Sequence, residues 1–323
     1  MAQILQPTPK NLDLLAGHLS RGDLVAIPTE TVYGLAGNAL DPEAVAKIYA
    51  AKGRPSRNPL IVHIRNQDQL DEIADASETA RHLISWLWPG PLTVILPKKL
   101  VVPDSVTAGL NTVAVRMPSH RVFKDLASRC TFPLAAPSAN PFGYVSPTRA
   151  EHVQAHLGES IDWILDGGPC EAGIESTIVS LADPNQPILL RHGSISIAQL
   201  ESILGRSVQE AIREPEDRDE GLRSPGLMKR HYSPHTPVRL FEGAPPQASQ
   251  EEAVVFLDGK HRAGENHFGL SSSGDLEEVA RNLYDCLQNL DHEGFQKIYL
   301  EQPDTSGIGL AIRDRMKRAA SQD

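Results

Sequence analysis

Residues 28–64, PTETVYGLAGNALDPEAVAKIYAAKGRPSRNPLIVHI, determine how the first part of this chain should fold. The apolar run 24–27 predicts a strand that Pro28 ends, and polar side chains follow at 29–31. Asp41 and a first-turn proline favour a helix start there, and Gly53 favours its end. Residues 60–64 then predict a second, buried strand. The stretch therefore reads as strand, polar turn, helix, basic loop and strand.

The basic loop after the helix is a candidate anion site. Lys52 and Arg54 flank Gly53, so both side chains can converge on one ligand. Arginine offers a rigid fork of donors and lysine a mobile point charge, a pair that suits a polyphosphate. Two cations at a helix C-terminus can also do no more than offset the helix dipole. The polar turn on one side and His63 on the other favour the anion site.

Length and composition limit the possible classes of protein. A chain of 323 residues allows two domains, and its net charge of −10 argues against a protein that coats nucleic acid. Three cysteines, Cys130, Cys170 and Cys286, form no C-x-x-C pair, which is typical of a reducing cytosol. We see no signal peptide and no run long enough to span a bilayer. We expect a cytoplasmic protein without a membrane partner.

Strand and helix patterns alternate over residues 1–207, which predicts an α/β domain. Strands are expected at 92–96 and 111–117, at the start of 133–140 before a small-residue turn, and near Trp163, Ile178 and Leu189. Helices are expected from Thr8-Pro9 through the apolar positions Leu12, Leu15 and Leu19, and at 78–88, 119–129, 148–157 and 196–204. Residues 208–237 contain an acidic tract and predict a linker. In 238–323, strands at 253–257 and 295–300 alternate with helices at 275–290 and 308–319, which predicts a small parallel, Rossmann-like domain.

Several motifs favour ordinary structural roles. The chain has no phosphate-binding P-loop motif, and the lone G-x-G at Gly307 and Gly309 is better read as a turn. His152 and His156 have the spacing of zinc ligands, but no third ligand is apparent, and we expect a surface or packing role. Pro234 argues against one helix carrying His231 and His235. Cys170 has no partner histidine nearby in the sequence and is expected to be a turn residue.

Two further candidates have two readings each. Ser138 and Asn140 lie in PSAN, where ordinary turn chemistry is sufficient, although opposite a basic loop they could bind phosphate and ribose. His63 lies in an apolar strand, where a histidine is usually a satisfied core residue. The residues alone leave both cases open.

Longer motifs resemble the threonylcarbamoyl-AMP synthases, a family of YrdC-like enzymes. The motifs are PTETVYGL (28–35), K-x-R at Lys52 and Arg54, NPLIVHI (58–64), S-x-N at Ser138 and Asn140, and ESTIV (175–179). SPGLMKRHYSP (224–234) and GLAIRDRMKRAA (309–320) are similar to motifs of the long, two-domain form. The resemblance implies a twisted, largely open sheet with helices, followed by a linker and the small second domain.

The resemblance also implies a reaction and its site. L-threonine, bicarbonate and ATP would give threonylcarbamoyl-AMP and pyrophosphate, the first step of threonylcarbamoyl-adenosine modification of tRNA. Lys52 and Arg54 would be catalytic, with Mg²⁺ carried by the ATP phosphates. The residues implied to bind threonine are Thr31, His63, Arg116, Ala136 and Ser176. Those implied to bind ATP are Arg54, Asn58, Thr112, Ser138, Asn140, Ser146, Arg191 and Tyr232.

The sequence departs from the family pattern in two places. Arg191-His192-Gly193 lacks the family's central proline, whose fixed φ could tighten the loop that carries Arg191. An extra residue in SPGLM shifts the register of the linker before Lys229, and with it Tyr232. We expect the linker to fold over the ATP site as a lid that excludes water.

A second class of function fits part of the pattern. YrdC-like sheets can present a basic concave face, so the chain could be a nucleotide-responsive RNA-binding module acting in tRNA or ribosome maturation. The overall acidity and the threonine-type residues favour the enzyme. Its partners would then be its substrates and the proteins that transfer threonylcarbamoyl to tRNA, with weak binding of tRNA or other RNA possible.

Overall fold

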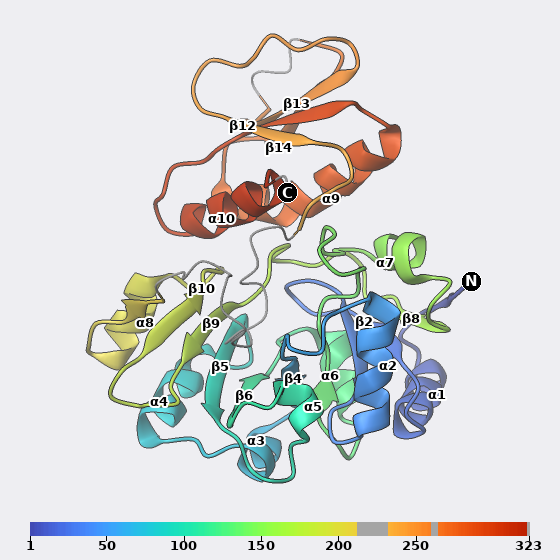
Figure 1. The fold of residues 1–323 in the computed structure, drawn as a ribbon, viewed down its shortest axis with the longest axis vertical. Helices are drawn as coiled ribbons and strands as arrows, with labels where there is room; N and C mark the ends of the chain where they lie inside the picture. The colour runs from blue at the N-terminus through green and yellow to red at the C-terminus, as the bar shows by residue number, and fades with distance from the viewer. Residues whose placement is uncertain (212–231, 260–263, 322–323) are drawn as a thin grey trace.

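The computed structural model describes residues 1–211, 232–259 and 264–321. They form two sheets with helices packed against them, and the smaller sheet lies above the larger one in Figure 1. We call the two parts the large-sheet domain and the small-sheet domain. This is the α/β architecture that the sequence patterns predict. In the described part of the chain, no helix is both long and apolar enough to cross a membrane.

The large sheet is built from short strands of mixed direction. They are β1 (Gln3–Leu5), β2 (Val25–Ile27), β3 (Gly34–Asn38), β4 (Ile61–His63), β5 (Leu92–Pro97), β6 (Thr112–Arg116), β7 (Leu134–Ala135), β8 (Trp163–Leu165), β9 (Thr177–Ser180), β10 (Ile188–Arg191) and β11 (Gln209–Glu210). Their order is β1-β8-β2-β3-β7-β4-β6-β5-β9-β10-β11. β4 lies parallel to β6, and this register makes His63 and Arg116 direct neighbours.

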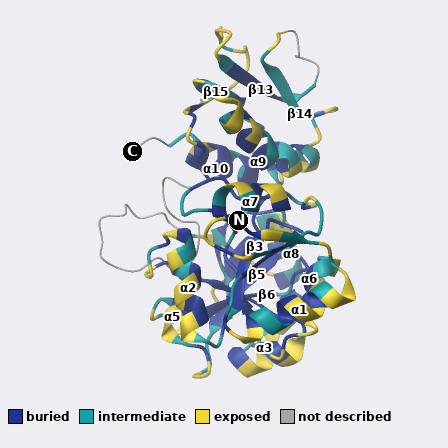
Figure 2. Ribbon diagram, turned by 90° about the vertical axis from the view of Figure 1, so that its right-hand side faces the viewer, coloured by how far each residue is buried: buried dark blue, intermediate teal, exposed yellow. Residues whose placement is uncertain are grey.

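Helices surround this sheet. They are α1 (Pro9–Ser20), α2 (Pro42–Lys52), α3 (Gln67–Ile73), α4 (Glu78–Leu87), α5 (Asp104–Thr107), α6 (Arg121–Ala127), α7 (Ala150–Leu157) and α8 (Ile197–Leu204). Figure 2 shows buried positions along the strands and exposed ones on the outer turns of α1 and α3. α2 begins and ends as its sequence predicts, with Asp41 as N-cap and Gly53 left-handed at φ 60°.

The strand β3 was not predicted, because the polar turn after β2 was read as leading directly to α2. Its sequence GLAGN contains two glycines, which have low strand propensity. The strand forms through its neighbours, pairing antiparallel with both β2 and β7. A Cβ at Gly34 would lie 3.1 Å from the Cβ of Ala136, so the small residue lets the turn after β7 approach closely.

The small sheet is entirely parallel, as predicted, with the order β12-β15-β13-β14. Its elements are β12 (Val238–Phe241), β13 (Glu252–Asp258), β14 (His267–Ser271), α9 (Leu276–Glu293), β15 (Lys297–Glu301) and α10 (Gly309–Ala319). β12 and β14 were not predicted, since both are short and only partly buried. β11 lies in the segment predicted as a linker and extends the large sheet by pairing with β10. Residues 212–231, with most of the expected lid, lie outside the described residues.

The two domains share one apolar cluster. From the large-sheet domain it includes Val32, Tyr144, Val145 and Ile174, and from the small-sheet domain it includes Leu283, Tyr284, Ile312 and Met316. The contact at Gly173 is especially close, because a Cβ there would lie 2.4 Å from the Cα of Arg281 in α9. The domains therefore pack backbone against backbone at this point. Figure 1 shows α9 and α10 between the small sheet and the large-sheet domain.

Candidate active site

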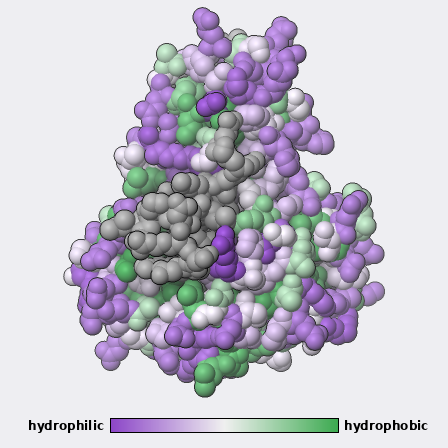
Figure 3. All heavy atoms as spheres, in the orientation of Figure 1, coloured by the Kyte–Doolittle hydropathy of each residue, from purple (hydrophilic) through white to green (hydrophobic). Residues whose placement is uncertain are grey.

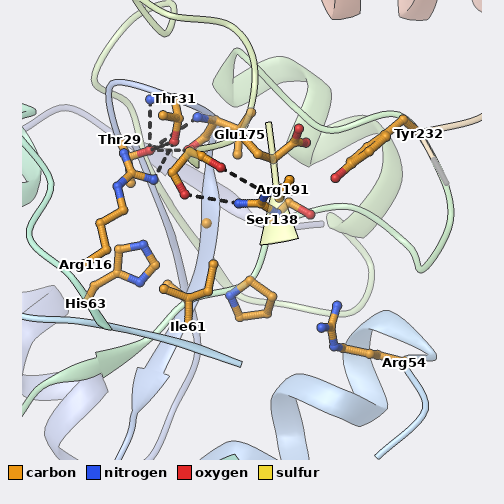
Figure 4. Close-up of a pocket in the computed structure, with 15 residues that line it drawn as sticks. Thr29, Thr31, Arg54, Ile61, His63, Arg116, Ser138, Glu175, Arg191 and Tyr232 are labelled. Carbon is orange, nitrogen blue, oxygen red and sulfur yellow. Dashed lines mark hydrogen bonds between the residues drawn. The ribbon is translucent and has the colours of Figure 1, made fainter. Parts of the chain in front are cut away.

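A pocket lies beside the ends of several strands of the large sheet, and Figure 4 shows it in close-up. Nine of the residues predicted for the site line it: Thr31, Arg54, His63, Arg116, Ala136, Ser138, Ser176, Arg191 and Tyr232. Five others do not line it: Lys52, Asn58, Thr112, Asn140 and Ser146. Six lining residues were not predicted as site residues: Thr29, Val32, Gly34, Ile61, Pro137 and Glu175.

Arg116 occupies one end of the pocket and is held in a fixed position. Its guanidinium lies 2.8 Å from Glu30 in a buried ion pair, and it donates to the Thr31 hydroxyl at 2.7 Å and to the Gly90 carbonyl. Burial would raise the pKa of Glu30, but Arg116 outweighs that effect and holds it below its usual value. The pair leaves a rigid donor fork that suits a carboxylate.

His63 lies beside Arg116 and faces the pocket in Figure 4. Burial, and then the charge of Arg116, lowers its pKa to about 3, so the imidazole is neutral at physiological pH. Among the described residues its Nδ1 has no hydrogen-bond partner, although it is fully buried. A polar ligand group could bind to this nitrogen.

Arg54 lies across the pocket from Arg116. It is buried and donates to the carbonyls of Asn58 and Pro59 and, at 2.6 Å, to the Asn58 side chain. Asn58 therefore holds Arg54 from behind and does not line the cavity. Burial, with a smaller contribution from the nearby charge of Arg191, lowers the pKa of Arg54 to about 10. Two like charges in one buried site are favourable when an anion lies between them.

Lys52 does not converge with Arg54 on the pocket. Its buried ammonium donates to the carbonyls of Ser138 and Asn140, behind the turn that the PSAN sequence forms. Burial, and then the charge of Arg54, lowers its pKa well below the usual value. Both cations therefore do more than offset a helix dipole, because each also donates to buried backbone carbonyls.

The residues Ser176 and Arg191 connect two strands at the pocket wall. The Arg191 side chain donates to the carbonyl and, at 3.1 Å, to the hydroxyl of Ser176, which also bonds the Thr93 hydroxyl. His192 replaces the family's proline, and its ring lies 3.3 Å from Glu210 of β11. The loop that carries Arg191 is thus held by side-chain contacts on both sides.

Glu175 brings a carboxylate to the pocket wall. It accepts hydrogen bonds from Ser146 at 2.6 Å, from Tyr284 of α9 at 3.0 Å and from Arg315 of α10 at 2.8 Å. Ser146 therefore acts on the pocket through Glu175. The ESTIV motif contained this residue, but its partners lie 109 and 140 residues further along the chain. Local sequence carries no sign of that arrangement.

Tyr232 closes the wall nearest the small-sheet domain. It is buried, with a positive φ of 62°, and its ring lies 5.7 Å from that of Tyr284. A non-glycine residue in this region of backbone space is uncommon and is held by its surroundings. Tyr232 therefore lines the pocket as predicted, despite the extra residue in the SPGLM motif that precedes it.

Two alternative sites from the sequence have other roles. The His152 ring lies 3.3 Å from Asp285 of α9 and so takes part in packing between the domains, whereas the His156 ring packs 4.3 Å from that of Tyr144 within its own domain. Cys170 is buried, and burial raises the pKa of its thiol far above the usual value, which makes a poor nucleophile. Within the described residues, no cluster of three or more His, Cys, Asp or Glu side chains could hold a metal.

Comparison with known proteins supports the fold and the motifs together. A family model described as telomere recombination (Sua5, YciO, YrdC) matches residues 18–193, and one described as the threonylcarbamoyl-AMP synthase C-terminal domain matches residues 195–321. Threonylcarbamoyl-AMP synthases of Pyrococcus abyssi and Bacillus subtilis are 39% and 43% identical, over 95% and 94% of this chain and 93% and 91% of theirs. The crystal structure of P. abyssi Sua5 complexed with L-threonine superposes with a TM-score of 0.89 at 36% identity, covering 99% of this chain and 98% of that one.

The fold and the pocket define an α/β protein with a pocket lined by three buried arginines, Arg54, Arg116 and Arg191. The similarity extends over both domains and over nearly the whole length of the relatives. The chain belongs to the threonylcarbamoyl-AMP synthase family, whose members are transferases.

Proposed function

We propose that the pocket of Figure 4 binds L-threonine at one end and ATP at the other, and that the chain forms threonylcarbamoyl-AMP from them with bicarbonate. One observation carries the proposal. A rigid fork and a neutral histidine stand at one end of the pocket, and two further buried guanidinium groups stand toward the other. An amino acid and a polyphosphate would be complementary to these two ends.

The threonine end consists of Arg116, His63, Thr31, Ala136 and Ser176. Arg116 would bind the carboxylate bidentately, because Glu30 already fixes its orientation. The unpartnered Nδ1 of His63 and the hydroxyls of Thr31 and Ser176 are suited to the ammonium and hydroxyl groups. Ala136 would leave room for the methyl group.

The ATP end consists of the lining residues Arg54, Ser138, Arg191 and Tyr232. The other residues assigned to ATP and to charge neutralisation do not line the pocket, and in this proposal they support the lining or act at longer range: Lys52, Asn58, Thr112, Asn140 and Ser146. Mg²⁺ usually reaches protein sites on substrate phosphates, and we propose that it enters with ATP.

We also propose that the chain divides into one domain at 1–207 and another at 238–323, with a linker between them.

The chemistry needs positioning more than covalent catalysis. The threonine amine and bicarbonate give a carbamate with loss of water, and a carbamate oxygen then attacks the α-phosphorus while the bond to pyrophosphate breaks. Such a transfer is accelerated mainly by alignment and by neutralisation of charge. Buried arginines meet that need, so no protein side chain has to act as a nucleophile. The product would pass to proteins that transfer threonylcarbamoyl to tRNA.

The test is pyrophosphate release by the purified chain. We expect release that requires L-threonine, bicarbonate and ATP together. Arg116→Lys should raise the KM for threonine by about tenfold and leave that for ATP within about twofold, because lysine keeps the charge without the fork. Arg121→Lys, at an exposed position of α6, serves as the matched control. Release that needs no threonine, or an equal change of both KM values, would contradict the proposal.

A further inference from the structure

Glu175 presents an electrostatic problem for a pocket that takes ATP. Its carboxylate lines the pocket and is buried, and it belongs to the same wall as Arg191. A free negative charge here would repel the phosphates and would compete with them for the guanidinium of Arg191. The pocket can bind a polyanion well only if something else compensates this carboxylate.

The compensating group comes from the other domain. Arg315 of α10 is fully buried, and its Nε donates to Glu175 Oε2 at 2.8 Å. The same guanidinium donates to the carbonyl of His192 at 2.8 Å, immediately after Arg191, and lies 5.3 Å from the centre of the Tyr232 ring. One side chain therefore contacts or adjoins three residues of the pocket wall.

The guanidinium is itself held firmly. Its Nη1 donates to Asp314 at 3.0 Å, and Asp314 also receives a hydrogen bond from Arg318 one turn later. Burial would raise the pKa of Glu175, yet Arg315, Arg191 and the Ser146 hydroxyl overcome this and hold it below the usual value. The carboxylate thus stays ionised and is paired with an arginine of the small-sheet domain.

We propose that Arg315 is a positioning residue for ATP: by compensating Glu175 from the second domain, it leaves Arg191 available to the phosphates. The proposal rests on the function proposed above. It assigns the small-sheet domain a part in the active site, since without α10 the compensation of Glu175 would fall to Arg191.

A simpler role for Arg315 would be to hold the two domains together. The structure contains a second interdomain ion pair with which this role can be compared. Arg149 of the large-sheet domain forms an ion pair of 2.6 Å with Asp285 of α9. This pair also joins the two domains, but neither residue lines the pocket. If adhesion were the whole role of Arg315, removal of either arginine should affect both substrates alike.

The experiment measures dissociation constants for ATP and for L-threonine by calorimetry at pH 8, where carboxylates are ionised. Arg315→Met should raise the ATP constant about tenfold or more, as expected when one partner of a buried charge pair is removed, and should leave the threonine constant within about twofold. Arg149→Met should leave both constants within about twofold. If the unaltered protein binds no ATP, the proposed function fails, and this proposal fails with it.

A second background isolates the charge compensation. In Glu175→Gln, which has no carboxylate to compensate, adding Arg315→Met should raise the ATP constant less than about threefold. The same large factor in both backgrounds would overturn the proposal, as would an unchanged ATP constant in folded Arg315→Met. If Arg315→Met alone does not fold, the comparison of Glu175→Gln with the double variant decides, because the double variant buries neither charge.

Discussion

At the scale of single residues, the pocket depends on buried polar groups whose charge is fixed by their neighbours. Glu30 fixes Arg116, and Asn58 fixes Arg54, so the two guanidinium groups face the cavity in set orientations. His63 differs, since the fold buries it as a neutral ring with an unpartnered nitrogen. Such a group costs stability unless a ligand satisfies it, which is typical of functional sites.

His63 should make the protein less stable in acid. Its folded pKa of about 3 lies below the unfolded value of 6.5, so below pH 6.5 the unfolded chain takes up a proton that the folded protein refuses. Stability should therefore fall as the pH drops from about 6.5 toward 3, by about 1.4 kcal/mol per unit. At pH 5 this amounts to about 2 kcal/mol.

The measurement is urea unfolding at pH 7 and pH 5. Between pH 7 and pH 5 the free energy of unfolding of the unaltered protein should fall by about 2 kcal/mol more than that of His63→Asn, because the two proteins share all other titrating groups. His82→Asn, at an exposed position of α4, should lose as much as the unaltered protein. An equal loss in His63→Asn would show that the folded protein protonates this ring as readily as the unfolded chain does, with burial and Arg116 opposing the proton less than the structure indicates.

At the scale of elements, sequence predicted those whose signals are local. α2 has its N-cap, proline and terminal glycine within one short stretch, and the buried strands β4 and β6 are apolar runs. β3 and β11 form because neighbouring strands pair with them, and their own residues carry little strand propensity. The same limit holds for the site: the family resemblance implied Arg116 and Arg191 as ligand-binding residues, but it did not assign a role to Glu175, although that residue lies in the ESTIV motif.

The side chain of Lys52 holds the end of α2 against the turn at Ser138 and Asn140. Its ammonium joins the C-terminus of α2 to the carbonyls of Ser138 and Asn140, so it shapes the turn that borders the ATP end. Lys52→Met keeps the volume and leaves these buried carbonyls without their donor, which should cost about 1–3 kcal/mol. It should also raise the KM for ATP by about tenfold, because Ser138 would shift. Urea unfolding and pyrophosphate release measure the two effects.

A lysine on the same helix provides the control. Lys47 is exposed and donates to one backbone carbonyl, that of Gly22. Lys47→Met should change stability by less than about 0.5 kcal/mol, as surface substitutions usually do, and should leave the KM for ATP unchanged. Equal effects at the two positions would mean that the turn does not depend on Lys52.

At the scale of the whole molecule, the two domains behave as one structure. Apolar residues of both share a cluster, and Glu175 is bonded by residues of α9 and α10. An interface of this kind couples packing to the site, because a shift of α9 would move Tyr284 away from the carboxylate. On the face drawn in Figure 3, the described residues of both domains are largely hydrophilic, with smaller apolar patches.

Gly173 is the position where this coupling can be tested without touching the pocket. Its φ of 72° and the 2.4 Å from its ideal Cβ to Arg281 Cα mean that Gly173→Ala must both strain the backbone and displace α9. Gly168, at φ 79° in the same loop, has nothing within 4 Å of its ideal Cβ. Gly168→Ala therefore carries only the backbone cost of about 1–2 kcal/mol.

The free energy of unfolding in urea should fall by about 1–3 kcal/mol more in Gly173→Ala than in Gly168→Ala, because of overpacking. Because α9 carries Tyr284, Gly173→Ala should also weaken ATP binding several-fold, whereas Gly168→Ala should not. If both variants bound ATP normally while only Gly173→Ala lost stability, the interface would support the fold without controlling the site.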